Sequence, residues 1–216
     1  MQRLVADTVR DYLAGLASPE DDVLAEVRRR SLADGVPAPS RDTAWLLHVL
    51  TAAVQAARVF EIGTGYGYSG MHVARALPAG GVLLTVERHP ARAALAKEHF
   101  ERAGLAAQAR VMVGPATRLV HKVAGPFDVI VQDGDKADYE PLLDHLIGLL
   151  RPRGVLVSDN ILWSGDVVPG SCDTPAHRQD SIDAIRRYNT RLASDPRLDT
   201  VFLPVGDGVA VSVKRV

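Results

Sequence analysis

The sequence predicts an α/β fold: a doubly wound, mostly parallel β-sheet with an antiparallel hairpin at its C-terminal end. A short apolar run ends in closely spaced glycines, Gly63, Gly65 and Gly67, as in a strand that turns into a helix around a nucleotide-type ligand. After it, apolar strand patterns alternate with helical ones, which implies right-handed crossovers and a parallel sheet. Near the end, Asp207-Gly208 separates two apolar runs, which is a hairpin signal.

The composition is that of an ordinary globular protein. The chain has 216 residues, of which 47% are hydrophobic and 24% charged, and this length suits a single domain with a large core. We therefore expect one domain over residues 1–216, with N-terminal helices over 1–57 and a sheet-containing core over 58–216.

Charge and cysteine content exclude several classes of function. The net charge of −1 gives no global basic field that would recruit nucleic acid, although a local RNA-binding patch stays open. No apolar run approaches the roughly twenty residues of a membrane span, and the N-terminus has no signal-peptide core. The single cysteine, Cys172, allows no internal disulfide and fits a reducing compartment. We expect a cytoplasmic protein that does not bind membranes.

Three helices are expected before the first strand. Residues 4–16 carry their apolar side chains on one helical face. Ser18-Pro19-Glu20-Asp21 predicts a helix start with Ser18 as the cap and proline at the first position, and this helix should end before Gly35. Ser40 is expected to cap the third helix. These helices could cover the sheet, form an oligomer surface or pack into the core.

The remaining elements follow in order. Strands are expected over 59–62, 82–86, 110–113, 127–132, 155–158, 200–204 and 209–213, and helices over 69–77, 91–103, 115–123, 139–150 and 174–192. In a sheet of this kind, ligands bind at the carboxyl ends of the parallel strands.

The glycine turn is flanked by acids that a pyrophosphate site would not favour. Glu61 lies within the strand just before Gly63, where a carboxylate would repel pyrophosphate but attract a cation such as the aminoacyl end of S-adenosylmethionine. Glu87 ends the next strand, where an acid binds a pair of ribose hydroxyls. Gly63 and Gly67 let a ligand approach the backbone closely, and Ser69 opens the following helix. The alternative is a pair of surface acids at strand ends.

Polar residues also end the fourth and fifth strands. Asp133 and Lys136 follow one strand, and Asp159 and Asn160 end the other. Because parallel strands end at the same edge of a sheet, the three oxygen-bearing side chains can converge, and such hard ligands suit Mg²⁺, Mn²⁺ or Ca²⁺. A partly desolvated lysine beside a cation loses proton affinity, so Lys136 can act as a general base. A solvated Asp/Lys loop is the alternative.

Four motifs occur in order along the chain: Glu-Ile-Gly-Thr-x-x-Gly-Tyr-Ser (Glu61–Ser69), Asp-Gly-Asp-Lys-x-x-Tyr (Asp133–Tyr139), Asp-Asn-x-Leu-Trp-x-Gly (Asp159–Gly165) and Pro-Val-Gly-Asp-Gly (Pro204–Gly208). With them, the chain resembles the bacterial members of the class I, metal-dependent O-methyltransferases of the caffeoyl-CoA and catechol type, from about residue 10 to its C-terminus. The resemblance implies a seven-stranded Rossmann-like sheet whose last two strands are antiparallel. It also implies a homodimer, since relatives commonly pair.

The resemblance assigns roles to individual residues. It implies that S-adenosylmethionine is held by Glu61, Gly63, Gly67, Ser69, Glu87 and Asp133, with Ala116 near the adenine. The metal, Mg²⁺ or else Mn²⁺ or Ca²⁺, would be held by Asp133, Asp159 and Asn160. Lys136 would be the catalytic base, acting beside Asp133. Trp163 would border the acceptor, or else only anchor its loop.

The chain departs from the family pattern in three places. Gly134 stands where the family usually has alanine, and we expect it to loosen that loop. Tyr66 stands where members often have threonine, which predicts a larger ring beside the cofactor cleft. The segment 169–179, which should line the acceptor pocket, gives no clear match.

Several functions therefore stay open. The first is methyl transfer to a small vicinal diol such as a catechol, and the second is methyl transfer to a hydroxylated uridine in tRNA. Only one arginine stands in Pro175–Asp180, where the tRNA-modifying relatives carry a run of basic residues, and this argues against RNA. An NAD-dependent dehydrogenase, or a non-catalytic cofactor-binding protein, is the alternative from a different class.

Overall fold

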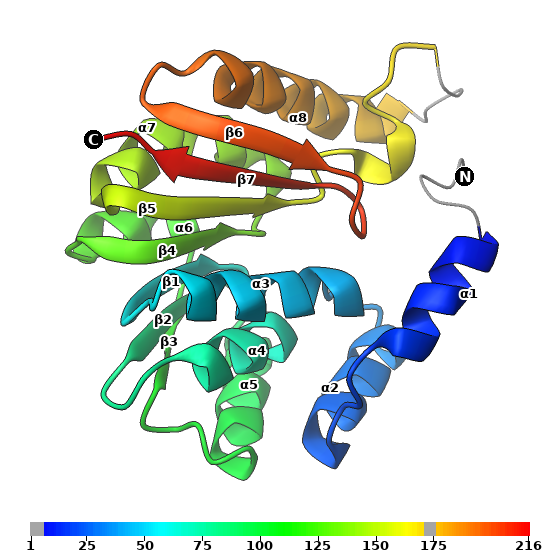
Figure 1. Ribbon diagram of the computed structural model, residues 1–216, viewed down its shortest axis with the longest axis vertical. Coiled ribbons are helices and arrows are strands. Elements are labelled where there is room, and N and C mark those ends of the chain that lie inside the picture. Colours follow the sequence, from blue (N-terminus) through cyan, green and yellow to red (C-terminus); the bar gives the residue numbers. More distant parts are fainter. Residues whose placement is uncertain (1–6, 171–175) are drawn as a thin grey trace.

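The structure, a computed structural model, describes residues 7–170 and 176–216. In these residues the strands are β1 (Arg58–Ile62), β2 (Val82–Glu87), β3 (Ala109–Val113), β4 (Phe127–Gln132), β5 (Leu150–Asp159), β6 (Leu198–Leu203) and β7 (Val209–Lys214). They form one sheet in the order β3-β2-β1-β4-β5-β7-β6 (Figure 1). Strands β1 to β5 pair in parallel, whereas β7 is antiparallel to both β5 and β6. The predicted fold class is confirmed.

The described helices are α1 (Asp7–Leu16), α2 (Asp22–Ala33), α3 (Arg41–Ala53), α4 (Tyr68–Ala76), α5 (Pro90–Arg102), α6 (Ala116–Leu119), α7 (Tyr139–Leu149) and α8 (Ala176–Ser194), with 3₁₀ turns at Val120–Lys122, Lys136–Asp138 and Trp163–Gly165. Within the described ranges, no helix combines the length and the apolarity that crossing a membrane requires.

Two layers of helices cover the sheet. Side chains alternate between the faces of a strand, so that Val129 of β4 packs with α2 to α5 while its neighbour Ile130 packs with α7 and α8. The same alternation occurs at Val157 and Leu156 of β5. Because both faces are covered, the parallel strands are apolar nearly throughout, as buried parallel sheets are.

The two predicted helix caps in the N-terminal region have different outcomes. Ser40 caps α3 as expected, since its Oγ accepts a hydrogen bond from Thr43 N at 3.0 Å. The prediction that Ser18 caps the second helix is wrong: Asp21 is the cap, and its side chain accepts from Leu24 N. Glu20 is drawn inward, to the hydroxyl of Tyr68, which is incompatible with its place in the first helical turn.

Two other helices differ from expectation, and the start of a third is not tested. The helix expected over 115–123 is a short α6 followed by a 3₁₀ turn. The helix expected over 139–150 ends at Leu149, because Leu150 already pairs with Phe127 as the first residue of β5. The expected start of the late helix, at 174, lies outside the described residues.

The apolar face expected on the first helix is exposed. Val9, Tyr12, Leu13 and Leu16 of α1 all remain open to solvent in the single chain. The predicted homodimer stays a prediction.

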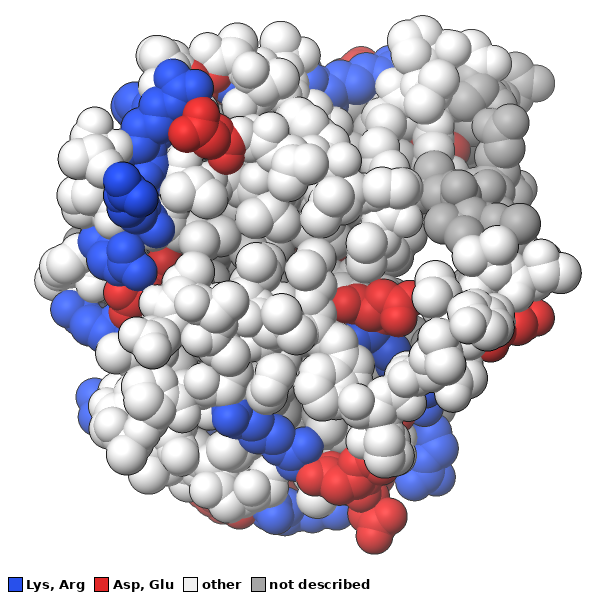
Figure 2. Space-filling model, viewed as in Figure 1, with Lys and Arg blue, Asp and Glu red and all other residues white. Residues whose placement is uncertain are grey.

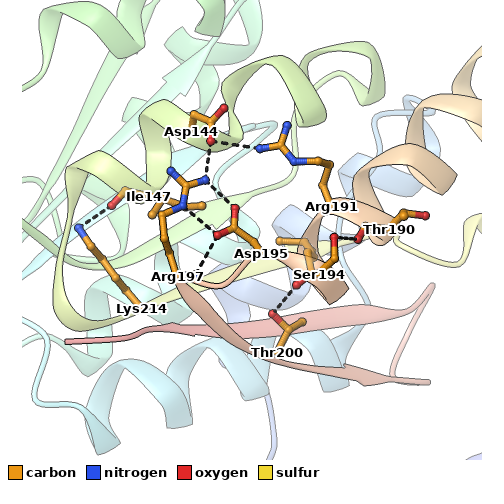
Figure 3. A network of polar contacts seen from close by, with 10 residues as sticks. Asp144, Ile147, Thr190, Arg191, Ser194, Asp195, Arg197, Thr200 and Lys214 are labelled. Carbon is orange, nitrogen blue, oxygen red and sulfur yellow. Dashed lines mark hydrogen bonds and ion pairs between the residues drawn. The ribbon is translucent and has the colours of Figure 1, made fainter.

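A network of polar contacts attaches the C-terminal strands to the helices (Figure 3). Arg197, just before β6, donates to Asp195 at 2.8 Å and to Asp144 of α7 at 2.5 Å. Lys214 at the end of β7 donates to the carbonyl oxygen of Ile147 at 2.8 Å. The hydrogen bond from Arg197 holds the pKa of Asp195 below its usual value. The network thus joins α7, the end of α8 and the hairpin.

Replacing Asp195 by asparagine should lower the free energy of unfolding by about 1–3 kcal/mol at pH 7, because charge-assisted hydrogen bonds are lost. A carboxyl with a lowered folded-state pKa stabilises the fold above its unfolded pKa of about 3.9. The difference from wild type should therefore shrink as the pH falls below about 4. Urea titrations across pH would measure it. The control is Asp199→Asn, which removes an exposed ion pair with Arg215 and should lower the free energy of unfolding by about 1 kcal/mol or less. An equal loss of stability in the two variants would contradict the prediction.

Candidate active site

The carboxyl ends of the parallel strands open onto a cavity of about 480 Å³. The molecule is hollowed on the right-hand side of Figure 2, where both acidic and basic side chains are visible. Seven of the residues predicted for the site lie on the wall of this cavity: Gly63, Glu87, Ala116, Asp133, Lys136, Asn160 and Trp163. The other four, Glu61, Gly67, Ser69 and Asp159, lie behind the wall.

Gly63 brings two strand ends into direct contact. It has φ +102°, and a Cβ placed on it would lie 2.2 Å from the carbonyl oxygen of Asp133. The end of β1 is hydrogen-bonded to both neighbouring strands at this point. Asp133 N, just after β4, donates to Ile62 O at 2.9 Å, and Gly63 N donates to Val86 O of β2 at 3.0 Å. Glycine is therefore required here by the approach of β4 as well as by any ligand.

Glu61 lies beneath the glycine turn and is fully buried. Its carboxylate accepts hydrogen bonds from Ser69 Oγ at 2.7 Å and from Thr85 Oγ1 at 2.6 Å. Burial raises the pKa of Glu61 to about 7. Glu61 is thus held behind the glycine turn by hydroxyl groups of α4 and β2. The sequence reasoning missed Thr85, since a threonine in a β-strand carries no signal beyond β-propensity.

Glu87 lines the cavity at the end of β2. Its two carboxylate oxygens accept from Gly65 N and from His89 N, both at 2.9 Å. These backbone donors fix the carboxylate at the end of β2, between the glycine turn and Ala116, the first residue of α6.

Lys136 lies among the predicted metal ligands. Its Nζ donates to Asn160 Oδ1 at 2.7 Å and contacts Asp133 Oδ1 at 3.4 Å, and the residue is only 7% exposed. Asp159 is buried next to this pair, and its Oδ1 accepts from Asn160 N at 2.8 Å. Burial raises the pKa of both Asp133 and Asp159; the negative charge of Asp133 raises that of Asp159 further. The predicted convergence of these side chains is observed.

Tyr139 is a site residue that sequence reasoning did not single out. Lys136 Nζ donates to its hydroxyl at 2.6 Å, and that hydroxyl lies 3.1 Å from the carbonyl oxygens of Gln132 and Asp159, to which it donates. The fully buried ring thereby joins the ends of β4 and β5 to the lysine. The available signal was the motif Asp-Gly-Asp-Lys-x-x-Tyr, which ends in Tyr139 but from which no role for the tyrosine was inferred.

The segment after β5 is held in a strained backbone. Asn160, Trp163 and Ser164 have φ of +57°, +46° and +57°, conformations that cost about 1–3 kcal/mol each outside glycine. The turn between β6 and β7 compensates, because Leu162 N donates to Asp207 O at 3.1 Å. Trp163 is thereby placed on the cavity wall, with its ring 5.8 Å from Lys136 Nζ.

The donor set suits a hard cation. No three His, Cys, Asp or Glu side chains in the described ranges cluster as a metal site; the predicted set consists of two carboxylates and the amide oxygen of Asn160. Asp133 and Asp159 are both desolvated beside a single ammonium group, that of Lys136. This excess of buried negative charge favours a further positive charge, and oxygen donors suit Mg²⁺ or Ca²⁺.

The fold and site define a Rossmann-like α/β protein with a cofactor-type cavity, and comparison with known proteins gives the family. Residues 16–215 match the O-methyltransferase family. The chain is 34% identical over 226 aligned residues to a catechol O-methyltransferase of Niastella koreensis, spanning the whole of both proteins. It is 33% identical over 179 residues to caffeoyl-CoA O-methyltransferase 1 of Arabidopsis thaliana, covering 80% of this chain and 69% of that one.

A solved structure agrees with these relatives. The O-methyltransferase TomG from Streptomyces achromogenes, involved in tomaymycin synthesis and solved in complex with SAM, superposes with a TM-score of 0.85 at 28% identity, covering 97% of this chain and 96% of that one. The chain belongs to the O-methyltransferase family. The predicted resemblance and enzyme class are confirmed.

The departures from the family pattern take a different form in the structure. The ring of Tyr66 is buried against α2 and α5 and is not part of the cavity wall, contrary to expectation. The loop at Gly134 packs closely, since a Cβ there would lie 2.7 Å from Ile62 Cγ2. Of the unmatched segment 169–179, residues 171–175, Cys172 included, lie outside the described residues.

Replacing Gly63 by alanine should lower stability by about 2–5 kcal/mol, because the new methyl adds overpacking to a left-handed backbone. Gly80→Ala is the matched control: it has φ +80°, but a Cβ there meets nothing within 4 Å, so only about 1–2 kcal/mol of backbone strain is expected. Thermal and urea unfolding of both variants would measure the difference. Equal destabilisation would show that the contact with Asp133 does not constrain residue 63.

Proposed function

We propose that this chain is an S-adenosylmethionine- and divalent-metal-dependent O-methyltransferase that acts on a small acceptor with vicinal hydroxyls, such as a catechol. The observation that carries the proposal is that one cavity, in a chain of this family, has Gly63 and Glu87 on one wall and Asp133, Lys136 and Asn160 on another. A cofactor and an acceptor bound to these walls would meet inside the cavity.

The cofactor-binding wall suits S-adenosylmethionine. Glu87, fixed by two backbone donors, is proposed to accept hydrogen bonds from the ribose hydroxyls. Gly63 lies on the cavity wall and is proposed to present its backbone to the ligand. Gly67 lies behind it and is proposed to contribute through the left-handed backbone of the turn, φ +93°, and Ala116 is proposed to lie near the adenine. Glu61 and Ser69 lie behind the turn, where the negative field of Glu61 favours a cationic ligand. The structure of TomG in complex with SAM supports S-adenosylmethionine as the cofactor.

Asp133, Asp159 and Asn160 are proposed to hold the divalent cation, Mg²⁺ or else Mn²⁺ or Ca²⁺. When bound, S-adenosylmethionine supplies an electrophilic methyl group and the cation supplies positive charge beside the acceptor oxygens. Buried carboxylates with raised pKa values and an oxygen-only donor set support this assignment.

Lys136 is proposed as the general base, whose Nζ would take the proton of the acceptor hydroxyl when the lysine is present as the neutral amine. Tyr139 and Asn160 hold that nitrogen at 2.6 and 2.7 Å, so the amine is oriented before the acceptor binds, and orientation of this kind contributes much of a catalysed rate. Trp163 is proposed to border the acceptor and to shield the amine from water.

Size and charge favour a small acceptor over RNA. A cavity of about 480 Å³ is in the range of small-molecule sites. The Lys and Arg side chains that line the left edge of Figure 2 lie at the end away from the hollow. Arg151 near the start of β5 and Arg215 just after the antiparallel β7 lie at the sheet edge opposite the carboxyl ends of the parallel strands. They are ion-paired with Asp128 and Asp199, which reduces their attraction for phosphate. Family membership also argues against a dehydrogenase.

The test is transfer of label from S-adenosylmethionine to a catechol panel and to bulk tRNA, each with Mg²⁺ and with EDTA. We expect label on a catechol in Mg²⁺ and its loss in EDTA. Label on tRNA alone would show that the acceptor is RNA and not a small catechol. Label that is still transferred in EDTA would show that the reaction does not need a divalent metal ion. Binding of the cofactor without transfer to either acceptor would contradict the proposed acceptor class.

Lys136→Met should lower kcat by about 10²–10⁴-fold, the usual contribution of a general base, while the affinity for S-adenosylhomocysteine stays within about twofold. Calorimetry and turnover at saturating cofactor would separate these effects. Lys122→Met, at an exposed position in the 3₁₀ turn after α6, is the control and should keep full activity. Undiminished turnover of Lys136→Met would exclude the lysine as the base.

A further inference from the structure

Two tyrosines of the glycine turn hold α2 at both of its ends. In Gly65-Tyr66-Gly67-Tyr68, the hydroxyl of Tyr66 donates to Asp34 Oδ2 at 2.8 Å, and the hydroxyl of Tyr68 donates to Glu20 Oε1. Asp34 is the C-terminal cap of α2, and Glu20 directly precedes its N-terminal cap. Both rings are buried, and neither tyrosine is part of the cavity wall.

Each carboxylate is also oriented by an arginine of α2 itself. Arg28 donates to Glu20 at 2.9 Å, and Arg30 Nε lies 3.7 Å from Asp34 Oδ2. The guanidinium of Arg30 also lies over the ring of Tyr66, 5.8 Å from its centroid. The buried Glu20 carboxylate is therefore a fixed acceptor, whereas the half-exposed Asp34 is held mainly by the hydroxyl of Tyr66. The two tyrosine hydrogen bonds together give α2 a defined position relative to the turn.

The position of α2 determines one wall of the cavity. The chain that leaves α2 passes through Val36 and Pro37, and both residues line the same cavity as Gly63. This connector rests on the turn: a Cβ placed on Gly65 would lie 3.4 Å from Pro37 O. Val36 is attached to α2 by its N–H, which donates to Ser31 O at 2.9 Å. A shift of α2 would therefore move this wall.

We propose that Tyr66 and Tyr68 are positioning residues for the cofactor: by holding α2 at both ends, they keep the Val36–Pro37 wall against the glycine turn. The glycines of the motif open one side of the turn to the ligand, while the tyrosines between them fasten the N-terminal helices to its other side. This inference rests on the proposed function in one respect, that the cavity binds S-adenosylmethionine.

The test removes single hydroxyls and leaves the rings in place. Tyr66→Phe should raise the dissociation constant for S-adenosylhomocysteine, measured by calorimetry, by about three- to tenfold, the effect of one lost hydrogen bond. Tyr68→Phe should act in the same direction. Asp34→Ala should match Tyr66→Phe, and the double variant should be no weaker than Asp34→Ala alone, because both changes remove the same contact. Tyr12→Phe, on exposed α1, is the control.

Limited trypsin digestion measures how readily the connector after α2 is cleaved relative to the rest of the chain, and a general loss of stability would not change this ratio. Arg30 and Arg41 flank the connector, so Tyr66→Phe should speed cleavage there selectively, and S-adenosylhomocysteine should slow it again. A lowered melting temperature with unchanged affinity and unchanged cleavage at these sites would overturn the inference and leave the proposed function intact. Failure of the wild-type chain to bind S-adenosylhomocysteine would overturn the proposed function itself.

Discussion

The contact between Gly63 and the carbonyl of Asp133 is the constraint on which the site depends. Strand β1 lies between β2 and β4, and its terminal turn is bonded to both neighbours through Val86 O and Asp133 N. Glu87, one residue beyond Val86, and Asp133 itself are thereby placed on two sides of one cavity. A side chain at residue 63 would separate them, so an absent Cβ sets the distance between the cofactor wall and the acidic wall.

The second constraint is the amount of negative charge that the fold buries near this contact. Glu61, Asp133 and Asp159 are all desolvated, and Lys136 is the cation that touches Asp133. A buried carboxylate is tolerated only when hydrogen bonds or opposite charge compensate it. For Glu61 the compensation is two hydroxyl donors, whereas Asp133 and Asp159 depend on Lys136 and Asn160. The site is thus arranged for cationic ligands, which supports both a sulfonium cofactor and a divalent metal ion.

The sequence was sufficient where a signal is local and insufficient where a partner is distant in the chain. Alternating patterns and the Asp207-Gly208 turn predicted the sheet because strand and hairpin preferences are local. The cap at Ser40 was predicted for the same reason. Ser18 failed as a cap because the neighbouring Glu20 is bound by Tyr68, 48 residues away.

Within the site, acids and glycines were recognisable because few other functions place them at strand ends. The hydroxyls of Thr85 and Tyr139 were not, since an inward threonine or tyrosine in the sequence looks like any packed side chain. Likewise, the orientation of Tyr66 is set by Asp34 and His99, on elements whose relative position no local pattern encodes. The role of Trp163 came from family resemblance, and its place on the wall depends on a strained loop supported by a turn more than forty residues later.

The N-terminal helices are consequently part of the site. A glycine turn alone leaves a cofactor exposed on the side away from the sheet, and here the connector after α2 supplies that side. The bonds that hold it come from tyrosines inside the same turn, so residues 61–69 specify both the ligand-facing backbone and the attachment of its cover. A substitution that preserved every glycine but lost the tyrosines would keep the shape of the turn and lose its enclosure. In this chain Tyr66 and Tyr68, on either side of Gly67, provide the attachment through their hydroxyls, and a small residue at either position would leave the backbone of the turn intact but remove that hydrogen bond.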